Sequence, residues 1–173
     1  MDAKASKIDI FFRAGGKNEI VVSDNGTGIS EKDLLLSIKR HATSKIQNDN
    51  LTNISTLGFR GEALSSISSV SHFIISSKIE GQSHGYEVNI NANKFQYIKP
   101  VQMHKGTTVA VKNLFSNIPA RLKFLKSDNY EALLIKKVIQ KFSMCFLQVE
   151  FNLFSDQKNI FSSNVVTSQT WSQ

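Results

Sequence analysis

The chain has 173 residues, of which 40% are apolar and 20% charged, with only two prolines and nine glycines. This length and balance fit one folded domain with a buried core, and they exclude a disordered or fibrous protein. The formal net charge of +7 allows a polyanionic partner such as a nucleic acid, although mild basicity is also common on surfaces that bind no polyanion.

The single cysteine, Cys145, excludes an intrachain disulfide bond, and its apolar neighbours predict that it lies in the core. The sequence has no apolar run near the roughly 20 residues of a membrane span and no signal peptide after Met1. We therefore expect an intracellular protein without a membrane partner. The four histidines lie far apart, which argues against a zinc site.

The first third of the chain predicts a β-hairpin, a helix and a loop. Residues 7–12 and 19–23 are β-rich runs separated by a Gly-Gly turn. Ser30 resembles a helix cap and precedes an apolar stripe, so we expect a helix over 31–40. The polar residues 41–55 predict a mobile loop that ends at a glycine-rich motif.

The rest of the chain alternates helices and strands. Residues 62–69 predict a helix, and four runs predict strands of one antiparallel meander: 70–79, 85–91, 95–101 and 107–111. A second amphipathic helix is expected over 128–142, and a last strand over 146–153. Residues 162–173 predict a frayed tail or the start of a linker. The order of elements indicates an α+β fold, with helices on one face of a mixed, mostly antiparallel sheet.

The first motif with chemical meaning is Asp24-Asn25-Gly26-Thr27-Gly28, which lies between a predicted strand and a predicted helix. Asp-Asn-Gly alone favours a tight turn. A helix rather than a second strand follows it, however, so the glycines can instead let the backbone approach a ligand that donates a hydrogen bond to Asp24.

Two further segments suit phosphate groups. Gly58-Phe59-Arg60-Gly61-Glu62-Ala63-Leu64 opens a helix, whose free N–H groups attract anions, although Glu62 also fits an ordinary helix start. Thr43, Ser44 and Lys45 offer two hydroxyl groups and an ammonium group at the start of the polar loop. A plain helix end followed by a new cap explains them as well.

These three motifs in this order, together with Pro119-Ala120-Arg121-Leu122-Lys123-Phe124-Leu125, resemble the MutL family of DNA mismatch repair proteins. That family shares a two-layer α/β sandwich with DNA gyrase, a heat-shock chaperone and histidine kinases. The resemblance implies one ATP-binding domain over 1–161.

The resemblance also assigns roles to single residues. Asp24 would hold the adenine amino group, Gly26 and Gly28 would let the ring pack closely, and Thr107 would lie near the adenine. Thr43, Ser44 and Lys45 would belong to a lid over ATP. The phosphates would be wrapped by the run Gly58, Phe59, Arg60, Gly61, Glu62, Ala63 and Leu64.

The family's general base, a glutamate, and its Mg²⁺-binding asparagine would lie upstream of Met1. No catalytic or metal-ligating residue can be assigned in this chain, so Mg²⁺ would arrive with the nucleotide. A base and a metal each commonly contribute a hundredfold or more to hydrolysis. We therefore expect this chain not to turn over ATP and to bind the nucleotide weakly.

The family further implies DNA, a MutS-type mismatch-recognition protein and a homo- or heterodimer through N-terminal domains as partners. It also implies a location in the cytoplasm and nucleoid of a bacterium or in the nucleus of a eukaryote. Candidate DNA contacts are Lys7, Arg13, Lys17 and Lys39, each of which also fits a solvated surface. A basic DNA- or protein-binding module that uses the same fold without ATP is the alternative function. A kinase or topoisomerase ATPase domain is less consistent with the Thr-Ser-Lys and Pro-Ala-Arg segments.

Overall fold

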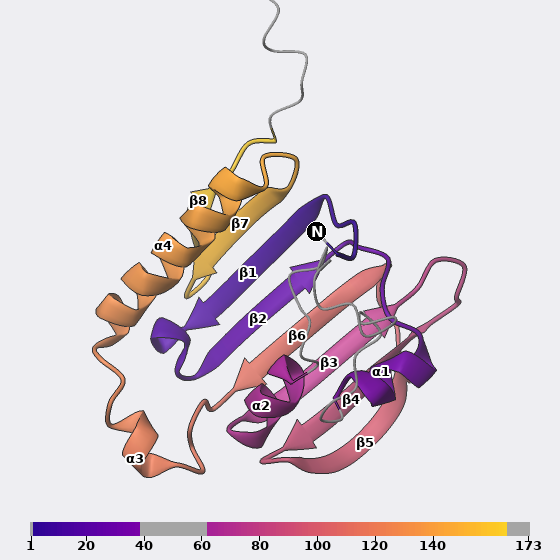
Figure 1. The fold of residues 1–173 in the computed structure, drawn as a ribbon, viewed down its shortest axis with the longest axis horizontal. Coiled ribbons are helices and arrows are strands. Elements are labelled where there is room, and N and C mark those ends of the chain that lie inside the picture. The colour runs from indigo at the N-terminus through magenta and orange to yellow at the C-terminus, as the bar shows by residue number, and fades with distance from the viewer. Residues whose placement is uncertain (1, 39–61, 166–173) are drawn as a thin grey trace, which may run out of the picture.

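In a computed structural model, residues 2–38 and 62–165 are described. Within them, eight strands form one sheet in the order β5-β4-β3-β6-β2-β1-β7-β8. Helices lie on one side of this sheet (Figure 1). The strands are β1 (Lys7–Arg13), β2 (Glu19–Asp24), β3 (His72–Lys78), β4 (Gly85–Asn91), β5 (Lys94–Val101), β6 (Gly106–Lys112), β7 (Glu150–Ser155) and β8 (Lys158–Ser162). The helices are η1 (Ala14–Gly16), α1 (Glu31–Ser37), α2 (Ala63–Ser69), α3 (Pro119–Leu122) and α4 (Asp128–Cys145).

The first two strands form the predicted antiparallel hairpin, joined through the short helix η1. Alternation sends Ile8, Ile10 and Phe12 of β1 to the helix-bearing face of the sheet. Ile10 and Phe12 are buried there. On its other edge β1 pairs with β7 in parallel, so the sheet is mixed as predicted.

The middle strands do not form one meander. β3, β4 and β5 are consecutive antiparallel neighbours, but β6 pairs with β3 and β2 rather than with β5. Residues 102–105 make the connection, and a chain at about 3.3 Å per residue can pass the ends of β4 and β3 over this length. The short link between β5 and β6 predicted that these two strands would be neighbours. Instead β6 lies between β3 and β2, where its apolar residues pack at the centre of the sheet.

The helices α1 and α2 cover the β3, β4 and β6 part of the helix-bearing face. Ser30 caps α1 by accepting a hydrogen bond from the Asp33 amide, as the capping pattern predicted. Leu34 of α1 is fully buried in a core cluster with Phe73, Ile75 and Val88. Leu64 and Ile67 of α2 pack against the same cluster.

The helix α4 covers the β1 and β7 part of that face. Ala132, Ile135 and Ile139 pack against a second cluster that contains Phe12 and Leu153. α4 ends at Cys145, whose side chain is exposed. The prediction that Cys145 lies in the core is therefore wrong, because its apolar neighbours Met144 and Leu147 are themselves 68% and 50% exposed.

Candidate functional site

A row of side chains crosses five strands on the helix-bearing face. The sheet register places Ile8, Asp24, Thr107, Ser77 and Tyr86 directly opposite one another on β1, β2, β6, β3 and β4. Residues directly opposite in an antiparallel pair have Cβ atoms about 4.5 to 5.5 Å apart and point to the same face. Asp24 and Thr107, which are 83 positions apart in sequence, are therefore neighbours.

The loop after Asp24 folds back on the carboxylate. The Gly26 amide donates a hydrogen bond to Asp24 Oδ1 over 2.8 Å. Gly28 has a φ of +73° and lies so close to the Lys78 carbonyl that a Cβ atom would collide with it, so this position requires glycine. At Gly26 a Cβ atom would lie 2.6 Å from the Ala3 carbonyl oxygen. Within the described residues, Asp24 Oδ2 receives no hydrogen bond and remains available to a donor.

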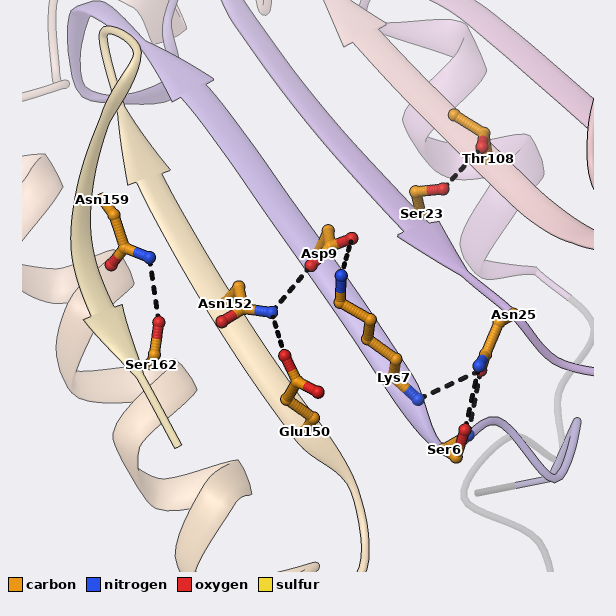
Figure 2. Close-up of polar contacts among 10 residues, drawn as sticks. All are labelled: Ser6, Lys7, Asp9, Ser23, Asn25, Thr108, Glu150, Asn152, Asn159 and Ser162. Atoms are coloured by element: carbon orange, nitrogen blue, oxygen red, sulfur yellow. Dashed lines mark hydrogen bonds and ion pairs between the residues drawn. The ribbon is translucent and has the colours of Figure 1, made fainter. Parts of the chain in front are cut away.

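Asn25 fastens the same loop to the start of β1 (Figure 2). Its Oδ1 accepts hydrogen bonds from the amides of Ser6 and Lys7 at 2.9 and 3.0 Å, and its Nδ2 donates to Ser6 Oγ at 2.9 Å. The Thr27 amide also donates to the Ala3 carbonyl over 2.8 Å. Residues 3–7 and the Asp24 loop are thus one connected unit.

Ser77, which the sequence interpretation missed, lies between these parts. Its side chain is 1% exposed. It accepts a hydrogen bond from the Ile29 amide (2.8 Å), donates to the Gly106 carbonyl (2.9 Å) and shares a hydrogen bond with Thr107 Oγ1 (2.9 Å). A signal was present, because Ser77 follows Phe73 and Ile75 on the core face and puts a polar residue where the alternation calls for an apolar one.

The predicted site is thus assembled in part within the described residues. Asp24, Gly26, Gly28 and Thr107 come together. Thr43, Ser44, Lys45, Gly58, Phe59, Arg60 and Gly61 lie outside the described residues. Glu62 is the N-cap of α2, and Ala63 and Leu64 form its first turn. At the other end of the row, a hydrogen bond with Glu31 of α1 raises the pKa of Tyr86.

The opposite face of the sheet carries polar side chains that pair with one another. Asp9 forms an ion pair with Lys7 at 3.2 Å and accepts a hydrogen bond from Asn152 Nδ2 at 2.9 Å (Figure 2). The hydroxyl groups of Ser23 and Thr108 share a hydrogen bond at 2.8 Å. A cavity of about 340 Å³ lies beside them. The cavity is lined by Lys7, Asp9, Ser23, Asp24, Asn25, Met103, His104, Lys105 and Thr108.

Three of the four candidate DNA contacts have acidic partners. Lys7 pairs with Asp9, Arg13 Nε lies 3.6 Å from Glu19, and Lys17 lies 2.7 Å from Asp128. Lys39 lies outside the described residues. In the part of the chain that is described, no three histidine, cysteine or acidic side chains gather as metal ligands, and no helix is long and apolar enough to cross a membrane.

Comparison with known proteins identifies the class. Residues 1–119 match the family described as histidine kinase-, DNA gyrase B- and HSP90-like ATPases, and the chain belongs to this family. The fold agrees, since the MutL ATPase domain of Aquifex aeolicus, solved in complex with ADP, superposes with a TM-score of 0.78 at 31% identity. That match covers 96% of this chain and 59% of the other.

Within the family, the chain is of the MutL type. It is 47% identical over 163 residues to the DNA mismatch repair protein MutL of Elusimicrobium minutum, and 44% identical over 170 residues to that of Carboxydothermus hydrogenoformans. These alignments cover 94% and 98% of this chain but 27% and 29% of the relatives, so the chain spans less than a third of their length. The fold and family predicted from the motifs are confirmed.

Proposed function

We propose that this chain is the nucleotide-binding part of a MutL-type DNA mismatch repair protein, and that adenine binds where Asp24 and Thr107 meet. The observation that carries this proposal is the Asp24 carboxylate, which lies directly across from Thr107 and whose Oδ2 receives no hydrogen bond within the described residues. The carboxylate accepts a hydrogen bond from the adenine amino group. Gly26 and Gly28 let the loop beside this carboxylate pack closely against Ala3 and Lys78. The ADP bound to the Aquifex aeolicus relative supports this reading.

The phosphates are assigned to Thr43, Ser44, Lys45 and the run from Gly58 to Leu64. The run from Gly58 leads into the start of α2, and the first amides of a helix favour anions. Mg²⁺ would arrive with the phosphates, where it offsets their charge. We assign it to no side chain. Hydrogen exchange tests the phosphate assignment, since ATP should protect residues 41–62.

The adenine site is tested with Asp24→Asn and the matched control Asp9→Asn on the neighbouring strand. Asp9 faces the other side of the sheet, so its loss should leave nucleotide binding unchanged. Loss of the Asp24 charge should lower the affinity for ATP at least about tenfold, because it removes a hydrogen bond to a charged group. Ligand-detected NMR measures weak affinities directly. Equal losses in both variants would sink the assignment.

For DNA, the helices α3 and α4 are better candidates than the paired cations named above. Residues 119–145 carry six basic side chains against two acidic ones. The basic residues are Arg121, Lys123, Lys126, Lys136, Lys137 and Lys141. One of the two acidic side chains, Asp128, already forms an ion pair with Lys17, which lies outside these helices. Unpaired cations are the ones that release counterions when they contact phosphates.

The double substitution Lys123→Glu, Lys126→Glu tests this surface, and Lys7→Glu on the opposite face of the sheet is the control. The reversal should weaken duplex DNA and flatten the salt dependence of binding, whereas Lys7→Glu should have little effect. We further propose that nucleotide state controls dimerisation and the contacts with DNA and a MutS-type protein. DNA affinity and mass measured with and without ATP separate this function from the alternative, a basic module indifferent to nucleotide.

A further inference from the structure

The hydroxyl group of Ser77 joins three segments of the nucleotide site. Through its three hydrogen bonds it connects the loop that enters α1 (Ile29), its own strand β3, and the start of β6 (Gly106 and Thr107). The group is buried, so no solvent competes for these bonds. A buried hydroxyl in this position must satisfy all its partners at once.

Counting hydrogens fixes the direction of each bond. A serine hydroxyl has one hydrogen and two lone pairs. The Ile29 amide can only donate, and the Gly106 carbonyl can only accept. The Ser77 hydrogen therefore goes to Gly106, and the second lone pair of Ser77 is left for the hydrogen of Thr107. With its hydrogen committed to Ser77, Thr107 presents only lone pairs to anything else.

We propose that Ser77 is a specificity-determining residue, which holds Thr107 as an acceptor and thereby selects adenine over guanine. The proposal rests on the proposed function, in which Asp24 and Thr107 contact the base. Asp24 and Thr107 are direct cross-strand neighbours, and Asp24 also offers only lone pairs when ionised. Where the C6 position of the purine meets this pair, two acceptors side by side favour the 6-amino group of adenine and repel the 6-oxo group of guanine.

The opposite face of the sheet supplies a matched control. Ser23 and Thr108 form a hydroxyl pair at 2.8 Å, on the same two strands as Asp24 and Thr107 and one position away (Figure 2). Their side chains point away from the row. Ser23→Ala removes the same chemical group as Ser77→Ala without touching Thr107.

The test compares ATP and GTP binding to the full chain, its Ser77→Ala variant and its Ser23→Ala variant by competition in ligand-detected NMR. We expect wild type and Ser23→Ala to prefer ATP equally. In Ser77→Ala the Thr107 hydrogen is released and can donate to guanine, so the ATP-to-GTP preference should fall about tenfold, partly through tighter GTP binding.

A purely structural role for Ser77 would weaken both nucleotides alike, and that result, or an unchanged preference, overturns the inference. If the wild-type chain binds neither nucleotide, the proposed function is wrong, and the inference that rests on it falls with it. Thermal melting checks the fold of each variant. Should Ser77→Ala not fold, Ser77→Cys takes its place, because it keeps the shape but bonds weakly, and the same loss of preference is expected.

Discussion

The two halves of the helix-bearing face are packed to very different depths. On the β3, β4 and β6 side, α1 inserts Leu34 so deeply that it is 0% exposed, as are Phe73 and Val88 beneath it. On the β1 and β7 side, none of the 18 residues of α4 is buried. A groove of about 490 Å³ runs between α4 and β1, β2 and β7, and it is lined mainly by apolar side chains.

The difference shows that an apolar helix stripe does not fix how closely the helix packs. Both helices have a serine cap and an apolar face. α4 is instead fastened at its first turn, where Lys17 lies 2.7 Å from Asp128 and the Glu131 carboxylate accepts the Lys126 amide. We expect the α1 half to depend on deep burial, and the α4 half on the shallower packing of Ala132, Ile135 and Ile139 together with this attachment.

The largest effect should come from Leu34→Ala, measured against Leu134→Ala on α4. Leu34 is fully buried, so its truncation should cost about 2 to 5 kcal/mol of unfolding free energy. Leu134 is 39% exposed at the groove, and its truncation should cost no more than about 1 kcal/mol. Urea denaturation measures both. Equal losses would mean that the two halves are packed alike.

A smaller effect is expected from Gly15→Ala, which targets the attachment of α4. Gly15 has a φ of +61°, and a Cβ atom there would lie 2.6 Å from the Asp128 carbonyl oxygen. We expect a loss of about 2 kcal/mol or more and faster hydrogen exchange in α4. Gly81→Ala is the control, because φ is +79° but no atom lies within 4 Å. It should cost only about 1 kcal/mol. Unchanged exchange in α4 would argue against the attachment.

Val138→Ser should change stability by less than about 1 kcal/mol, since the side chain is 50% exposed. Val138 lines the groove, so its replacement should nevertheless reduce the fluorescence of a bound apolar dye. Leu36→Ser on α1 is matched in exposure, at 49%, but lies away from the groove. A drop in dye fluorescence with both variants would show that the dye does not report on the groove.

The smallest effect is a pH dependence on the α1 side. The hydrogen bond with Glu31 raises the pKa of Tyr86 above 10.0. A raised folded-state pKa means that this contact stabilises the fold below pH 10.0 and is lost as the pH rises through the folded value. Glu31→Gln should lower the pKa of Tyr86, followed by ultraviolet absorbance in a Tyr97→Phe, Tyr130→Phe background. An unchanged titration would contradict the contact.

Much of the fold follows from alternation of apolar residues, but two features do not. The strand β8 was missed because residues 155–158 lack a full hairpin signal: Asp156 and Gln157 both have positive φ, and Gln157 stands where glycine usually follows aspartate. The position of β6 in the sheet depends on which strands have an unpaired edge, and the length of the four-residue link before β6 does not reveal this. Local sequence predicts elements better than it predicts their partners.

The candidate site was partly visible in the sequence for a similar reason. Asp24, Gly26 and Gly28 lie within one short motif, whereas Ser77 acquires its role only from the register of β3 against β6. Likewise, the acidic partner of Arg13 becomes apparent only when β1 is paired with β2, whereas Lys7 and its partner Asp9 lie two positions apart on one face of β1. Charge alone named those cations as candidate DNA contacts and gave no weight to α3.

The hydrogen bonds of Asn25 tie the loop after Asp24 to residues 6 and 7 at the start of β1. Because this side chain takes up the amides of Ser6 and Lys7, the loop cannot shift without breaking bonds to the start of β1. Linkage works in both directions, so a ligand that favours the closed loop must also shift residues 3–7 toward their closed state, by the same coupling free energy. The start of β1 is therefore coupled to the Asp24 loop, so under the proposed function nucleotide binding would change how readily residues 3–7 open.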